Sequence, residues 1–171
     1  ADTSMLRYSD ERSRQFFDEA LRRVRALPGV QAAAFATRLP FSPNFNQMNI
    51  AVPGHQTASD QMGPPVQSAQ VSSEYFETLR IPLLQGRVFT ATDTPETPRV
   101  AVINQTMARR FWPNGDAIGQ RVHERTLAGK PFEIVGIVAD HKLQTVGEKP
   151  QPAIFHAAAQ RPSAFYNIVA R

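Results

Sequence analysis

Residues 100–115 read VAVINQTMARRFWPNG, and this stretch decides the fold class. Its first four residues form a continuous apolar run, which predicts a buried strand. Asn104 follows as a favoured helix N-cap, and Met107 and Phe111 recur behind it at helical spacing. The Trp-Pro-Asn-Gly sequence at the end predicts a turn. The order is therefore strand, helix and turn.

The next part of the chain predicts a hairpin. Residues 120–126 and 132–139 are two strand-like segments separated by the sequence Ala-Gly-Lys-Pro. The second segment, FEIVGIVA, is apolar enough to lie centrally in a sheet. Further short strands are expected at 153–155 and 166–170. Hairpin signals mixed with strand-helix units favour an α+β fold with a mixed sheet over a doubly wound parallel sheet.

The N-terminal region predicts a long amphipathic helix over residues 5–27. The Leu-Pro-Gly sequence at its end predicts a stop and a reversal of the chain. The segment VQAAAFAT at 30–37 then predicts a strand of small residues on which the helix could lie closely. The apolar positions of the helix recur at spacings of three and four, and they are Tyr8, Phe16, Phe17, Ala20, Leu21, Val24 and Leu27.

Residues 39–65 are rich in Pro, Asn, Gln, Gly and Ser, which predicts long loops. A short apolar piece at 48–52 predicts one exposed strand inside this region, and 66–71 predicts a further strand. The sequence SSE at 72–74 predicts an N-cap followed by one or two helical turns. The final strand stops at Arg171 with no element behind it, so we expect a fragment of a longer polypeptide.

Composition excludes several function classes. The 171 residues are 42% hydrophobic and 20% charged, as in ordinary globular domains. The absence of cysteine excludes disulfides, thiolate zinc sites and cysteine nucleophiles. A net charge of +4 comes from scattered arginines without a basic run, so no nucleic-acid partner is expected. No stretch approaches the ~18 apolar residues of a membrane span.

Motifs for cofactors and catalysis are missing from the sequence. The glycines form neither a dinucleotide fingerprint nor a phosphate-binding loop, so we expect no cofactor and no ATP bound by this chain. The histidines are isolated, so we expect no metal, and the pairs His123-Glu124 and Asp140-His141 are expected to be solvated. No serine lies in a nucleophile elbow, and no catalytic residue is predicted. The Phe111-Trp112 pair is interpreted as a packing anchor.

Several of these stretches resemble, in the same order along the chain, the extracytoplasmic core domain of MacB-like and FtsX-like ABC-transporter permeases. The matching pieces are ALPGV at 26–30, VSSEYFETL at 71–79, IPLLQGRVF at 81–89, Asp93, VAVIN at 100–104, RRFWP at 109–113, DAIGQR at 116–121 and IVGIVAD at 134–140. Arg80 stands where the family usually has glycine, and His156-Ala157 replaces an aromatic-x-proline ending, whereas Gln160 keeps the place of a frequent glutamine.

The resemblance implies a single extracytoplasmic core domain over 1–171, belonging to a longer permease. It implies a porter-like βαβ part, assigned to 1–72 plus 150–171, and a second mixed α/β subdomain inserted into it at 73–149. The domain would lie on the periplasmic or extracellular face of the cytoplasmic membrane, anchored by flanking transmembrane helices. Its partners would be a cytoplasmic ATPase subunit or domain, a second permease copy, and a periplasmic adaptor or an exported substrate.

The resemblance also implies a non-catalytic role in which ATP-driven motion of the membrane helices is passed outward. The helix at 5–27 would be the lever. Two alternatives remain open: a soluble periplasmic binder of ligands or peptides that uses the loop 39–65, and a hydrolase that uses His141 or His123. The helix would be attached through Phe16, Phe17, Leu21 and Val24, and the expected scaffold residues are Tyr75, Phe76, Arg87, Phe111, Trp112, Pro113 and Gly119.

Overall fold

The computed structural model describes residues 2, 9–41, 46–55 and 61–171. Its elements are α1 (Asp10–Arg25), β1 (Ala33–Ala36), β2 (Gln47–Ala51), β3 (Pro65–Val71), α2 (Tyr75–Thr78), β4 (Leu83–Gly86), β5 (Val100–Asn104), α3 (Gln105–Phe111), β6 (Arg121–Glu124), β7 (Pro131–Val138), β8 (Ala153–Ala157) and β9 (Asn167–Ala170).

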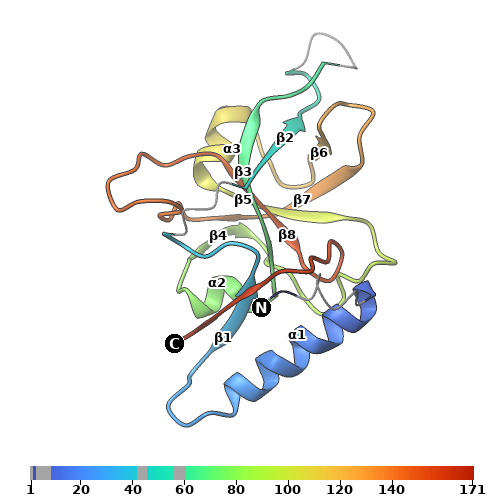
Figure 1. The fold of residues 1–171 in the computed structure, drawn as a ribbon. Coiled ribbons are helices and arrows are strands. Elements are labelled where there is room, and N and C mark those ends of the chain that lie inside the picture. Colours follow the sequence, from blue (N-terminus) through green and yellow to red (C-terminus); the bar gives the residue numbers. More distant parts are fainter. Residues whose placement is uncertain (1, 3–8, 42–45, 56–60) are drawn as a thin grey trace.

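Within these described residues, nine strands form one mixed sheet in the order β2-β6-β7-β5-β8-β3-β1-β9, with β4 paired to β7 (Figure 1). Strand β2 also pairs with β3, so the path from β2 to β3 closes into a ring. The β3–β8 and β5–β7 pairs are parallel, whereas β6 and β7 form the expected antiparallel hairpin. The prediction of an α+β fold with a mixed sheet is confirmed.

Side chains on the two faces of the ring strands enter different cores because successive residues of a strand point to opposite sides. In β5, Ala101 and Ile103 join one buried cluster with Ile50 and Phe132, and helix α3 adds Met107 to it. Val102 faces the other way, into a cluster built around Tyr75, Phe76 and Phe155. The central strands are consequently buried on both faces.

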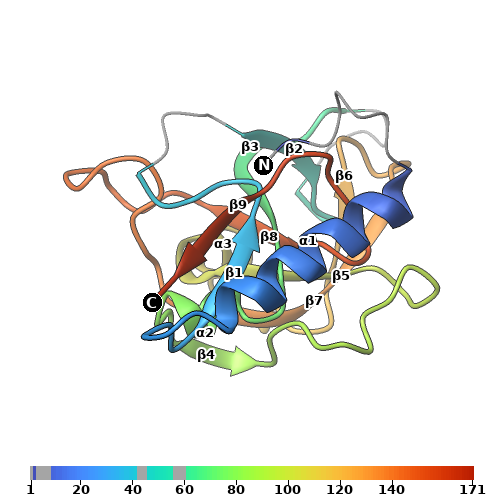
Figure 2. The same cartoon turned by 60° about the horizontal axis from the view of Figure 1, so that its bottom comes forward.

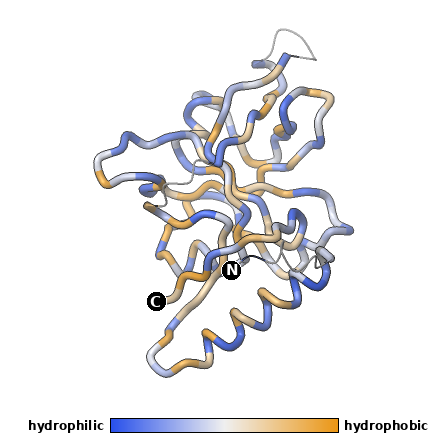
Figure 3. The backbone as a smooth tube through the Cα atoms, in the orientation of Figure 1, coloured by the Kyte–Doolittle hydropathy of each residue, from blue (hydrophilic) through white to orange (hydrophobic). Residues whose placement is uncertain are grey.

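Helix α1 packs on the outer end of the sheet, across β1 and β9 (Figure 2). Ser9 is its N-cap, and the Ser9 Oγ accepts a hydrogen bond from the Arg12 N–H at 3.3 Å. The helix ends at Arg25, and residues 5–8 of the predicted helix lie outside the described residues. Apolar and polar stretches alternate along the helix (Figure 3), which agrees with one face packed on the sheet.

One local prediction is wrong, and a second holds in position but without a side-chain capping bond. The strand predicted as exposed at 48–52 is β2, whose Ile50 is fully buried because β2 closes the ring between β3 and β6. The short helix α2 has Glu74 at its N-cap and no side-chain capping bond. The N-cap therefore lies within the predicted stretch 72–74, and the Ser72 hydroxyl accepts from the Phe35 N–H at 3.2 Å, which ties β1 to the end of β3.

The division into 1–72 plus 150–171 and 73–149 stays a prediction. Strands from both proposed parts pair with each other, β2 with β6 and β8 with β5. A hydrogen-bonded sheet therefore continues across the proposed boundary.

Arg80, the residue that replaces the family's usual glycine, has a φ of 54°, in the left-handed region. A residue other than glycine in this backbone conformation destabilises the folded state by about 1 kcal/mol relative to glycine. Because the Arg80 side chain is exposed, its removal should cost little packing. Arg80→Gly is expected to raise the free energy of unfolding by about 0.5–1 kcal/mol, the gain being reduced by the greater freedom of unfolded glycine. Urea denaturation measures it, and an unchanged or lower midpoint would contradict the expectation.

Candidate coupling site beneath helix α1

The aromatic ring of Phe17 fixes α1 to the sheet. Its side chain is fully buried, and its ring centroid lies 4.8 Å from that of Tyr166 in an edge-on contact and 6.1 Å from that of Phe35. Leu21 is buried in the same cluster, and Val24 packs against it. Phe16 is 41% exposed and touches the edge of Phe17 at 5.3 Å, so the prediction that Phe16 attaches the helix is corrected.

The C-terminal end of α1 is tied down by Arg25. Its guanidinium donates to the carbonyl oxygen of Ala33 in β1 at 2.9 Å and forms an ion pair with Glu74 at 3.0 Å. Burial raises the pKa of Glu74, but a backbone hydrogen bond and the Arg25 guanidinium outweigh it and hold this pKa below its ordinary value. One side chain thus links the helix both to β1 and to the start of α2.

The solvent face of α1 carries an ion-pair cluster of its own. Glu19 accepts from Arg22 and from Arg23, each at 2.7 Å, one turn further along the helix. These hydrogen bonds lower the pKa of Glu19 to about 2. Pairs of this spacing support helical conformation, although exposed ones contribute little to overall stability.

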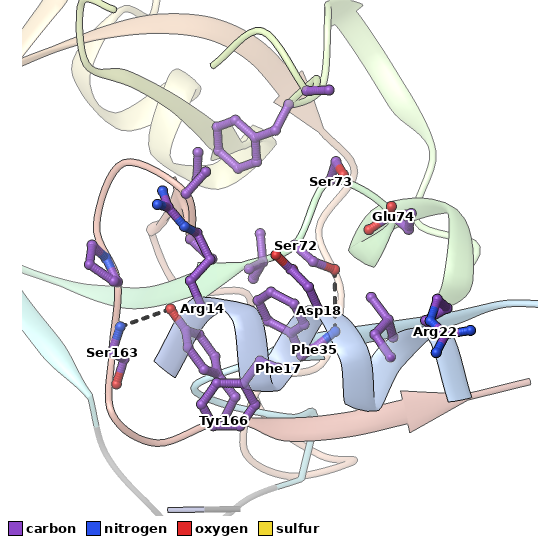
Figure 4. Close-up of a pocket in the computed structure, with 18 of the residues that line it drawn as sticks. Arg14, Phe17, Asp18, Arg22, Phe35, Ser72, Ser73, Glu74, Ser163 and Tyr166 are labelled. Atoms are coloured by element: carbon purple, nitrogen blue, oxygen red, sulfur yellow. Dashed lines mark hydrogen bonds between the residues drawn. The ribbon is translucent and has the colours of Figure 1, made fainter. Parts of the chain in front are cut away.

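A cavity of about 410 Å³ lies between α1 and the sheet (Figure 4). Helix α1 forms one wall, and the segments 71–74, 89–91 and 157–163 form the others. Its apolar surface comes from Phe17, Leu21, Phe35, Val71, Phe89, Ala157, Ala158 and Tyr166. Its polar lining includes the hydroxyl groups of three serines and of Thr90 together with several charged side chains.

Arg14 and Asp18 are the charged side chains of α1 that point into this cavity (Figure 4). Within the described residues neither forms an ion pair. Burial raises the pKa of Asp18 above its ordinary value, and the charge of Glu74 adds to the rise, against the lowering effect of Arg14 and Arg25. The lining offers charge, hydrogen bonding and aromatic surface, which suits binding and packing.

The scaffold residues predicted from the sequence lie in two other places. Tyr75 and Phe76 are buried around Phe155, at ring distances of 6.1 and 5.2 Å. Phe111 is buried in the cluster inside the ring, whereas Pro113 and Gly119 are exposed turn residues. The structure does not gather the predicted residues into one site.

Arg87 holds the segment that leads to the cavity. Its guanidinium binds both carboxylate oxygens of Asp93 at 2.9 Å, and the Thr90 N–H donates to the same carboxylate at 2.8 Å. Burial raises the pKa of Asp93, but these donors outweigh it and keep the pKa below its ordinary value. The turn 90–93 is thereby fixed next to Phe89, which lines the cavity.

Gln160 explains why glutamine suits this position of the family pattern. Its side-chain oxygen accepts from the Val100 N–H at 2.9 Å. Its amide group donates to the Thr94 carbonyl at 3.1 Å and to the Thr97 hydroxyl at 2.9 Å. One amide therefore ties the loop before β5 to the end of β8.

Trp112 is half-buried against the cluster inside the ring, with its ring centroid 5.8 Å from that of Phe111. We expect Trp112→Ala to lower the free energy of unfolding by about 1–3 kcal/mol, less than for a fully buried tryptophan. Thermal melting of the variant against the unaltered chain measures the effect. An unchanged melting temperature would contradict the packing role.

The histidines considered for catalysis are dispersed. His141 stacks on Phe155 at 5.6 Å, and the His123 Nδ1 lies 3.1 Å from the Gly129 carbonyl oxygen. Asp140 accepts from the N–H and the hydroxyl of Thr106, at the start of α3. In the part of the chain that the structure describes, no group of three or more His, Cys, Asp or Glu could hold a metal ion.

His156 is buried, 4.6 Å from the ring of Phe132, and burial lowers its pKa to about 3, with Arg161 and Arg99 adding to the shift. An unfolded histidine titrates near pH 6.5, so between pH 6.5 and 3 the unfolded state binds a proton that the folded state does not. The neutral, buried His156 therefore makes its full contribution to the free energy of unfolding above pH 6.5, and this contribution is lost as the pH falls towards 3.

We expect this single group to remove about 2 kcal/mol of stability between pH 7.5 and pH 5. His156→Leu should remove that part of the pH dependence, because leucine has no group to protonate. Denaturant unfolding of both proteins at the two pH values measures the difference. Equal losses of stability in both would refute the assignment.

Sequence reasoning missed Arg14, Asp18, Phe35 and Tyr166 as members of one site. Arg14 and Asp18 lie on a helix rich in charged residues, so the pattern indicated an exposed face. Phe35 lies in β1 and Tyr166 directly precedes β9, and the pairing of these two strands brings the residues together. Residues 42–45 and 56–60 of the loop 39–65, predicted by the binding alternative to contact a ligand, lie outside the described residues.

The fold is that of the extracytoplasmic domains of ABC-type permeases. The periplasmic region of MacB from Actinobacillus actinomycetemcomitans aligns with a TM-score of 0.58 at 16% identity, covering 84% of this chain and 55% of that one. The extracellular domain of the noncanonic transporter YknZ from Gram-positive bacteria aligns with a TM-score of 0.61 at 14% identity, covering 90% and 71%.

The chain belongs to the family of MacB-like periplasmic core domains, which it matches over residues 3–169. It is similar to the macrolide export ATP-binding/permease protein MacB of Mannheimia succiniciproducens, at 27% identity over 104 residues. It is also 37% identical over 78 residues to a probable export ATP-binding/permease protein MacB of Pseudomonas entomophila. The matched segments cover 60% and 45% of this chain but only 15% and 11% of those proteins. The family predicted from the sequence is confirmed.

Proposed function

We propose that the chain is a non-catalytic domain that passes ATP-driven motion of a permease's membrane helices to the outer side of the membrane. The family supports a place in an export permease, whose ATPase would be a cytoplasmic domain or subunit. A second permease copy, and an adaptor or an exported substrate outside the membrane, complete the proposed partners. Within the described residues no helix is long and apolar enough to cross a bilayer. The proposal assigns the anchoring membrane helices to flanking parts of the permease.

The attachment of α1 is the observation that carries this proposal. The helix is fixed through the buried Phe17 in its middle and through Arg25 at its C-terminal end. A helix held at two separated points moves with the sheet as one body, so a force on its N-terminal end displaces the whole domain. Reactive groups are not needed for such a role, whereas packing and stiffness are.

The proposal predicts a nucleotide-dependent displacement at the end of the domain remote from α1. The turn between β6 and β7 lies at that end (Figure 1), and Lys130 in this turn is exposed. The chain has no cysteine, so Lys130→Cys offers one labelling site in this domain. In the complete permease with its ATPase, the distance from this label to one on the outer end of a membrane helix should change when ATP binds. An unchanged distance in a permease that binds and hydrolyses ATP would refute the proposal.

A further inference from the structure

The cavity beneath α1 is lined by one positive and one negative side chain whose charges act on each other but which form no ion pair within the described residues. Arg14 and Asp18 lie one helical turn apart and both point into it (Figure 4). In the described part of the chain neither forms a hydrogen bond or an ion pair. The other charged groups of the rim are paired, Arg25 with Glu74 and Arg22 with Glu19. What remains for a ligand is one guanidinium and one carboxylate.

The remaining surface of the cavity is aromatic and aliphatic. Phe17, Phe35 and Tyr166 pack against one another on the side of α1 and β1, and Phe89 also lines the cavity. The volume of about 410 Å³ falls within the range of small-molecule sites. Such sites combine an apolar body with a few polar groups that orient the ligand, and this cavity has both.

We propose that this cavity binds a small amphipathic zwitterion, whose anionic group pairs with Arg14, whose ammonium group pairs with Asp18, and whose apolar groups cover the aromatic surface. A guanidinium binds a carboxylate through two parallel hydrogen bonds, and an ammonium donates to a carboxylate in the same charge-assisted way. Asp18 is exposed and Arg14 is half-buried. An apolar anion would pair with Arg14 alone, and an apolar cation would pair with Asp18 alone, so each would form only one of the two charge-assisted contacts. A molecule that carries both charges satisfies the site.

The environment of Asp18 agrees with this assignment. Burial and the neighbouring charge of Glu74 raise its pKa, so the carboxylate stands in a position where a cation is favoured. Arg14 also feels the charge of the exposed Glu96, which lies outside the cavity lining. The proposed ligand site does not depend on the coupling role of the domain, and the two can fail separately.

Isothermal titration of the 171-residue chain with the dipeptide Leu-Phe tests the proposal. Leu-Phe carries both charges and two apolar side chains. N-acetyl-Leu-Phe lacks the ammonium, and Leu-Phe amide lacks the carboxylate. We expect saturable binding of one Leu-Phe per chain and affinities at least about tenfold lower for each blocked form.

Two variants test which side chain binds the ammonium group of Leu-Phe and which binds its carboxylate. Asp18→Asn should bind Leu-Phe only as well as N-acetyl-Leu-Phe, because the ammonium loses its partner. Arg14→Gln should bind Leu-Phe only as well as Leu-Phe amide. Gln15→Ala, on the exposed face of α1, is the matched control and should behave as the unaltered chain. Thermal melting of each variant shows that it is folded. Absence of saturable binding at millimolar dipeptide, equal affinities for the blocked forms, or selectivity unchanged in both charge variants would overturn the proposal.

Discussion

Phe17→Ala is expected to lower the free energy of unfolding by about 3–5 kcal/mol, the range for a fully buried phenylalanine. Its side chain is 0% exposed and contacts the rings of both Phe35 and Tyr166. Truncation would leave a void that the strands on both sides of β1 cannot fill, since their own hydrogen bonds hold them in place. Urea denaturation followed by circular dichroism measures the change.

Phe16→Ala is the matched control for this prediction. It also removes a phenylalanine side chain, but from the preceding residue of the helix, where the side chain is 41% exposed. We expect a loss of about 1 kcal/mol or less. A loss for Phe16→Ala as large as that for Phe17→Ala would contradict the described orientation of α1.

Gly136→Ala is expected to destabilise the sheet by about 3 kcal/mol or more, as severe overpacking does. A Cβ atom at Gly136 would lie 2.0 Å from the carbonyl oxygen of Arg87, because β4 approaches β7 closely where Gly86 pairs with Gly136. Backbone cannot move aside as a flexible side chain can. The strand β4 would therefore separate from β7, or the sheet would distort.

Gly115→Ala is the matched control because an added Cβ meets nothing within 4 Å there and the residue has no positive φ. Its thermal midpoint should stay close to that of the unaltered chain, whereas that of Gly136→Ala should fall steeply. Similar midpoints for the two variants would refute the close approach of β4 to β7.

Elements defined by local patterns were predictable. The stretch at 100–115 folds as β5 and α3, and the Asn104 Oδ1 caps the helix by accepting from the Met107 N–H at 3.0 Å. The hairpin of β6 and β7 follows in the same way from its two strand-like segments and the turn between them. Each of these features depends on residues within about one turn or one hairpin of each other.

Features set by distant contacts were not predictable. The closure of the ring by β2 depends on pairing with both β3 and β6, and this pairing buries a strand whose surroundings in sequence are polar. The edge strand β4 is exposed along its whole length, so it has no alternating pattern to reveal it. The cavity beneath α1 was hidden for a similar reason, since the charged residues that enter it resemble those that face solvent.

The proposed role of the domain requires that a stiff α1 transmits motion to the rest of the domain. Glu11→Gly combined with Gln15→Gly tests stiffness directly, because both side chains are exposed and lie between the N-terminal end of α1 and its attachment at Phe17. Each glycine weakens the helix by about 1 kcal/mol relative to alanine. Glu11→Ala combined with Gln15→Ala is the control, since it removes the same side chains but keeps the helix stiff.

The decisive measurement is the ATP-dependent distance change from the label at Lys130→Cys to the outer end of a membrane helix, in the complete permease with its ATPase. We predict that the double glycine variant loses most of this change while it still hydrolyses ATP, and that the double alanine variant keeps it. A double glycine variant that moves as far as the unaltered permease would contradict the claim that α1 is the lever.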